Sequence, residues 1–118
     1  MTLERPSLSR WVKLAATGGI PEGETTGVVI EGRSIGLYNV RGKIHATEDI
    51  CPHARVRLSD GRFDGRTIEC PIHAARFDVV TGRRLSGPLC RDLFVYPIKI
   101  EEDAIYVDLE RIPITRAL

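Results

Sequence analysis

Two short motifs place the strongest constraint on what this chain can fold into. The first is Cys51-x-His53 and the second is Cys70-x-x-His73, with sixteen residues between them. Together they contain two of the three cysteines and two of the three histidines of the chain. Thiolates suit zinc and the iron of iron–sulfur clusters, and imidazole is accepted by both metals. Four such side chains in one stretch therefore predict a metal site.

The order of the ligands distinguishes two hypotheses about that metal. Structural zinc sites usually draw their ligands as close cysteine pairs and close histidine pairs, whereas each motif here supplies one residue of each kind. A cluster of two irons and two sulfides, with cysteines on one iron and histidines on the other, needs this mixture. Two loops that each give one cysteine and one histidine can hold such a cluster from both sides. We interpret the motifs as an iron–sulfur site, with a structural zinc module that binds another protein as the alternative.

The residues around the motifs resemble a known family, the Rieske ferredoxins that serve bacterial aromatic-ring-hydroxylating dioxygenases. The similarity covers most of the chain and lies in the runs IGLYNVRGKIHATEDICPH, LSDG, CPIHAARFDVVTG and VYPIKIEEDAIYVDL. It implies one Rieske-type 2Fe-2S cluster, with Cys51 and Cys70 on the buried iron. His53 and His73 would bind the outer iron, with their imidazole edges near solvent. In the same family a proline-containing loop closes over the cluster, and Ser86-Gly87-Pro88 resembles that loop.

The resemblance also implies a function. A soluble Rieske ferredoxin of this type carries single electrons from a flavin-dependent ferredoxin reductase to the terminal oxygenase, as part of aromatic hydrocarbon catabolism. The chain is not expected to be an enzyme, because a mononuclear iron oxygenase holds a second iron with two histidines and a carboxylate, and only His45 remains for this. The alternative within the same cofactor class is a small Rieske subunit of a larger reductase, similar to that of nitrite reductase. We expect a monomer with no nucleic-acid partner.

Four positions beside the ligands predict where the reduction potential lies. In the high-potential respiratory relatives, the corresponding residues form a disulfide between the loops and donate hydrogen bonds to the cluster. This chain has Val56, Ile72, Ala75 and Phe77 there, and none of these side chains can do either. We therefore predict a potential at the low end of the Rieske range, on the order of −150 mV.

Apolar alternation and turn residues predict an all-β fold. The expected strands cover Trp11–Ala15 and Thr25–Glu31, followed by two hairpins, Ser34–Val40 with Lys43–Ala46 and Leu93–Ile100 with Ala104–Leu109. Gly42 supplies the positive φ of the first hairpin turn, and Pro97 indicates an edge position in the second. Many short strands predict an antiparallel sandwich or barrel. We expect a single domain over residues 1–118, with a cluster-binding subdomain inserted at about 47–90.

Charge and cysteine usage suggest location and surface properties. The net charge is +1, but residues 55–91 contain eight arginines against four acidic residues, a local balance of +4. These arginines either solvate the loops or steer an acidic partner surface toward the cluster. The first thirty residues hold no signal-peptide pattern and no membrane span is expected, so we predict a cytoplasmic protein. Cys90 is predicted to be a partly buried packing residue.

Overall fold

The structure is a computed structural model that describes residues 10–72, 74–88 and 90–110. Apart from two short 3-10 turns, η1 (Thr17–Gly19) and η2 (Leu58–Asp60), the regular structure within these ranges is β-strand. The strands are β1 (Trp11–Ala16), β2 (Thr25–Ile30), β3 (Arg33–Val40), β4 (Lys43–Glu48), β5 (Arg62–Phe63), β6 (Thr67–Glu69), β7 (Arg76–Asp78), β8 (Arg84–Ser86), β9 (Ile98–Glu101) and β10 (Ala104–Asp108). The all-β prediction is confirmed. No helix in the described ranges is long and apolar enough to cross a membrane.

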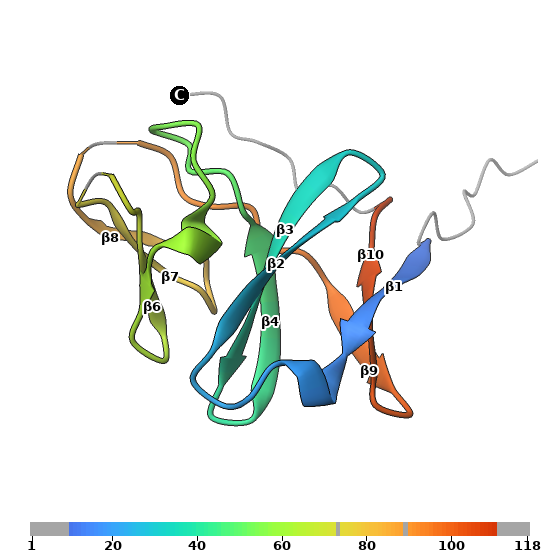
Figure 1. Cartoon of the computed structure of the whole chain (residues 1–118). Coiled ribbons are helices and arrows are strands. Elements are labelled where there is room, and N and C mark those ends of the chain that lie inside the picture. The colour runs from blue at the N-terminus through green and yellow to red at the C-terminus, as the bar shows by residue number, and fades with distance from the viewer. Residues whose placement is uncertain (1–9, 73, 89, 111–118) are drawn as a thin grey trace, which may run out of the picture.

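The strands form three antiparallel sheets with the orders β1-β10-β9, β2-β3-β4 and β5-β6-β7-β8. In Figure 1 the first two sheets lie side by side, and the third forms a separate lobe beyond β4. Pairing of β1 with β10 joins the two ends of the described chain. The stretch between β4 and β9 therefore leaves the two three-stranded sheets, forms the third sheet and returns (Figure 1).

Tight turns set the register of the two predicted hairpins. Arg41 and Gly42 connect β3 to β4, with φ values of 54° and 90°. Glu102 and Asp103 connect β9 to β10, with φ values of 49° and 66°. Two consecutive residues at positive φ form the two-residue turn whose twist matches that of the flanking strands. The prediction for Gly42 is confirmed, whereas nothing in the residue types at the second turn indicates the same geometry.

One predicted strand differs from the structure. The first arm of the last hairpin was expected over Leu93–Ile100, but β9 begins only at Ile98. Pro97 has no N–H to donate to a ladder, and β9 is an edge strand, as that proline indicates. The residues before Pro97 contact β4 instead, through a bridge between Val95 and Thr47. This segment thereby connects the lobe of the third sheet to the central sheet.

Two apolar clusters fill the fold. The first lies between the two three-stranded sheets and consists of Ile20, Ile35, Leu37, Ile44, Ala46, Tyr96, Ile105, Val107 and Leu109. The second consists of Tyr38, Cys51, Leu58, Ile68, Cys70, Ala75, Phe77, Val79 and Leu93. Both motif cysteines belong to the second cluster, so the candidate metal site lies against its own hydrophobic core. Cys90 is partly buried and packs against this cluster, which confirms the prediction that it is a packing residue.

Candidate metal centre

The two cysteine motifs lie in loops that are closed in the same way. The N–H of Cys51 donates to the carbonyl of Val56 at 2.9 Å, and the N–H of Cys70 donates to the carbonyl of Ala75 at 2.9 Å. Each bond spans five residues and forms the base of one loop. Both cysteines are only 2% exposed. The first ligand loop (50–57) and the second ligand loop (70–75) therefore present one buried thiol each.

The surroundings of Cys51 suit a thiolate bound to metal. Burial raises the pKa of the Cys51 thiol, while the backbone N–H groups of Ala54 and His53 act against it and lower the pKa. The thiol of Cys70 lies within interaction range and raises the pKa of Cys51 further. A bound metal ion would resolve this conflict, because it would take the place of the proton and leave a sulfur that the two N–H groups can stabilise. The two thiols are therefore close enough to interact with each other.

The structure describes two of the three histidines, His45 and His53. His53 is exposed at the surface of the first ligand loop, as expected for a ligand of an outer iron. His73 lies outside the described residues. His45 lies on β4 opposite Tyr38, away from both ligand loops, and burial lowers the pKa of its imidazole. Its position agrees with the interpretation that it is not a ligand.

A third segment packs against the second ligand loop. A Cβ atom built on Gly87 would lie 2.5 Å from the carbonyl oxygen of Ala74 and 2.5 Å from Cα of Ala75. Gly87 also has a positive φ of 92°, which L-residues with a side chain rarely adopt. Glycine is thus required here by both space and conformation. The 86–88 segment adjoins the second ligand loop, as its likeness to a proline-containing cover loop suggested.

Glu48, the last residue of β4, binds two residues of the chain that follows the 86–88 segment. Arg91 donates hydrogen bonds to both oxygens of the Glu48 carboxylate, one of them at 3.0 Å. The guanidinium of Arg91 also lies 4.4 Å from the centre of the Phe94 ring, and the N–H of Phe94 donates to Glu48 at 2.9 Å. A two-pronged bond between guanidinium and carboxylate fixes orientation as well as distance. The end of β4 and the chain leaving the third segment are held together beside Cys51.

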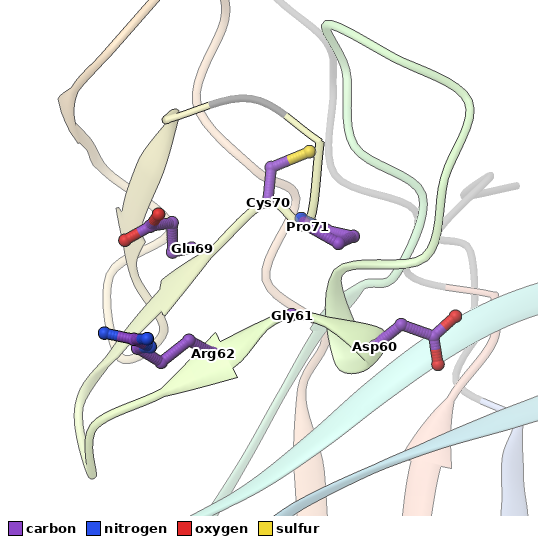
Figure 2. Close-up of a pocket in the computed structure, with 6 residues that line it drawn as sticks. All are labelled: Asp60, Gly61, Arg62, Glu69, Cys70 and Pro71. Carbon is purple, nitrogen blue, oxygen red and sulfur yellow. The ribbon is translucent and has the colours of Figure 1, made fainter.

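A shallow pocket of about 390 Å³ opens beside the second cysteine, lined by Asp60, Gly61, Arg62, Glu69, Cys70 and Pro71. Figure 2 shows the side chain of Cys70 at the end of β6, with its sulfur directed away from the side chains of Arg62 and Glu69. Pro71, directly after Cys70, has a ring that fixes φ and stiffens the loop at the ligand. The sulfur is directed away from the β5–β6 hairpin, as would be needed for a metal ligand (Figure 2).

Several residues that shape the site carry no pattern by which the sequence alone would reveal them. Asp49 and Ser59 form hydrogen bonds at the base of the first ligand loop, and Gly61 lies against the backbone of Glu69. The burial of Asp49 would draw attention to it, because an aspartate is rarely buried without a partner, but that burial is visible only in the structure.

The donor set and the loops fit an iron–sulfur cluster. Two buried thiols lie together and an exposed imidazole lies on one of the same loops, and two like loops in a small all-β fold hold them. The comparisons with known proteins agree, since the Rieske [2Fe-2S] domain model matches residues 10–97. The chain belongs to this Rieske family. Its cofactor is accordingly a Rieske-type 2Fe-2S cluster. Like the small relatives described next, it is an electron-transfer protein and not an enzyme.

The similar proteins are small ferredoxins. The chain is 46% identical over 100 residues to the ferredoxin component of a naphthalene 1,2-dioxygenase system from Pseudomonas aeruginosa, covering 85% of this chain and 96% of the relative. It is 46% identical over 100 residues to a Ralstonia ferredoxin component of naphthalene 1,2-dioxygenase and salicylate 5-hydroxylase systems, with the same coverage of both chains. Among solved structures, a chain in the complex of reduced oxygenase and oxidized ferredoxin of carbazole 1,9a-dioxygenase has a TM-score of 0.82 and 34% identity, covering 89% of this chain and 97% of that one. The ferredoxin of Sphingomonas yanoikuyae B1 has a TM-score of 0.80 and 32% identity, over 84% of this chain and 98% of that one.

Proposed function

We propose that this protein is the ferredoxin component of an aromatic-ring dioxygenase system. It accepts single electrons from a flavin-dependent reductase and passes them to the terminal oxygenase. Support comes from the relatives, whose whole length the chain nearly covers and which are ferredoxin components of such systems. The observation that carries the proposal is the pair of like loops, which hold two buried thiols and an exposed histidine at one end of the molecule. When bound, the cluster supplies the one-electron redox chemistry.

We propose four ligands for the cluster: Cys51 and Cys70 on the inner iron, and His53 and His73 on the outer iron. The burial and mutual proximity of the two thiols support the first pair. The exposure of His53 supports an outer position for the imidazoles, because an electron leaves most readily where a ligand edge reaches the surface. In this assignment each loop binds both irons, so the two loops must keep a fixed separation.

We propose a monomeric, cytoplasmic protein with one domain over residues 1–118 and a cluster-binding subdomain at about 47–90. The third sheet and the second apolar cluster support that boundary, because most of their residues fall within it. With Cys51 and Cys70 assigned to the cluster, Cys90 has no intramolecular disulfide partner, which agrees with a reducing compartment. Sedimentation or gel filtration of the purified protein tests whether it is a monomer. Permanent association of this chain with a larger reductase chain would contradict that proposal.

The electron paramagnetic resonance spectrum and the midpoint potential test the function directly. We expect the reduced protein to show the spectrum of a cluster with mixed nitrogen and sulfur ligands, and a midpoint potential on the order of −150 mV. The physical reason is the lack of donors near the cluster: Ala75 and Phe77 are fully buried and have no polar side-chain atom. A midpoint potential above zero would contradict this argument and would not suit an acceptor of electrons from a flavin reductase.

Arg55 tests whether positive charge steers the partner. The ion pairs of residues 55–91 within the described chain involve Arg57, Arg66, Arg76 and Arg91. Arg55 is exposed, two residues after His53, and has no carboxylate of the described residues within 4 Å. We expect Arg55→Gln to slow electron delivery to the oxygenase a few-fold at low salt and to weaken its dependence on ionic strength.

The matched control for Arg55 is Lys43→Gln. It removes one positive charge at the first residue of β4, whereas the first ligand loop follows the other end of that strand. We expect the delivery rate of this variant to equal that of the wild type at every salt concentration. Equal rates for Arg55→Gln and Lys43→Gln would show that the arginines only solvate the surface.

A further inference from the structure

A buried carboxylate lies at the base of the first ligand loop. Asp49 is fully buried, at 0% exposure, and lies two residues before Cys51. Its side chain accepts two hydrogen bonds from Ser59, one from the backbone N–H at 2.8 Å and one from Oγ at 2.6 Å. Removing a carboxylate from water is costly unless donors of this kind replace the solvent. Asp49 and Ser59 therefore depend on each other.

The backbone of Asp49 closes the loop at the same place. The N–H of Leu58 donates to the carbonyl of Asp49 at 2.6 Å, and the N–H of Asp49 donates to the carbonyl of Ser34 on β3 at 3.0 Å. One step further into the loop, Ile50 and Arg57 form a β-bridge. Both ends of the first ligand loop are thus joined to each other and to the central sheet through one residue.

Two glycines leave the space in which this arrangement fits. Gly27 on β2 and Gly36 on β3 are register partners. A Cβ atom on Gly27 would lie 2.5 Å from Oγ of Ser59 and 2.7 Å from Oδ2 of Asp49. A Cβ atom on Gly36 would lie 2.9 Å from Oδ1 of Asp49 and 2.9 Å from the hydroxyl oxygen of Tyr38. Glycine weakens a strand interior and often marks the close approach of another part of the chain. Here the Asp49–Ser59 pair approaches both glycines, and Tyr38 also approaches Gly36.

We propose that Asp49 and Ser59, seated on Gly27 and Gly36, are positioning residues that hold the first ligand loop closed around the cluster. The second ligand loop has no buried carboxylate at its base among the described residues, whose buried polar side chains are Asn39, Thr47, Asp49 and Asp108. Its base consists of the Cys70 to Ala75 bond and the β6–β7 ladder. The inference rests on the proposed assignment of Cys51 and His53 as ligands.

The test uses Ser59→Ala in the cluster-loaded protein. This change removes one hydrogen bond to a carboxylate and alters no charge. We expect the visible chromophore to be lost to an excess of iron chelator about tenfold faster than in the wild type, as one hydrogen bond to a charged group implies. Hydrogen exchange measured by mass spectrometry should increase in a peptide covering residues 49–59 and not in one covering 69–76. The matched control is Gly19→Ala, since a Cβ at Gly19 meets nothing within 4 Å.

A double-mutant cycle with Gly27→Ala tests whether the space left by this glycine is needed by the Asp49–Ser59 pair. If the added methyl acts by displacing Ser59, Gly27→Ala should accelerate cluster release much less in a Ser59→Ala background than alone. Where Gly27→Ala gives no soluble protein, Ser59→Ala decides by itself. A wild-type release rate for Ser59→Ala, or equal increases of exchange in both loops, overturns the proposal. Retention of the cluster in Cys51→Ala would instead overturn the ligand assignment, so the two failures are distinguishable.

Discussion

Replacing Cys51 or Cys70 with alanine is expected to give a colourless protein that delivers no electrons. Each thiol is buried at the base of its loop, so no solvent ligand can easily take its place on the inner iron. Metal binding also contributes folding free energy. Both variants should therefore melt at a lower temperature than the cluster-loaded wild type, and so should wild-type protein from which the iron has been removed. Visible absorbance, iron content and thermal unfolding measure these effects.

Cys90→Ala is the matched control for this prediction. Cys90 packs against the same apolar cluster, and burial raises the pKa of its thiol, but it lies in neither ligand loop. Its variant should keep full colour and iron content. His53→Ala extends the test to the outer iron, where we expect loss of the chromophore and of electron delivery. If the chromophore and electron delivery survive in His53→Ala, the proposed ligand set is wrong.

The parts of the fold that follow from the sequence are those with a local cause. The cysteine and histidine motifs predicted the cofactor, because four such side chains in one stretch have few other uses. Gly42 predicted a hairpin turn, since only a few residue types tolerate the positive φ that it requires. Strands with alternating apolar residues, such as β1 and β3, were predicted within two residues of their ends.

The parts that could not be predicted depend on contacts between distant segments. Asp49 meets Ser59 only because the loop between them is folded back, and Gly27 supports that pair from a strand more than twenty residues earlier. No local pattern contains such an arrangement. The arginines show the same limit: composition gave a surplus of positive charge, but only the structure shows that Arg91 is committed to Glu48 while Arg55 is not in an ion pair among the described residues.

Gly61→Ala is expected to disrupt the cluster lobe more than any other single methyl addition at a described glycine. A Cβ atom at this position would lie 1.9 Å from the carbonyl oxygen of Glu69 and 3.1 Å from that of Leu58. Both atoms belong to the backbone, so no side-chain rotation can relieve the overlap. The next residue, Arg62, begins β5 and pairs with Glu69 on β6. Figure 2 shows Gly61 between η2 and β5, close to Cys70.

The backbone carrying Cys70 must therefore move if the methyl is to fit. We expect Gly61→Ala to lose about 3 kcal/mol of stability, the upper end of the usual cost of overpacking, and to bind little or no cluster when expressed with a full iron supply. Iron content per chain and the midpoint of urea unfolding measure the two effects. Gly18→Ala provides the control, because a Cβ there meets nothing within 4 Å. A Gly61→Ala protein with full iron content would mean that the β5–β6 hairpin can shift without moving Cys70, in which case the position of this cysteine is set by its own loop and not by the strand that leads into it.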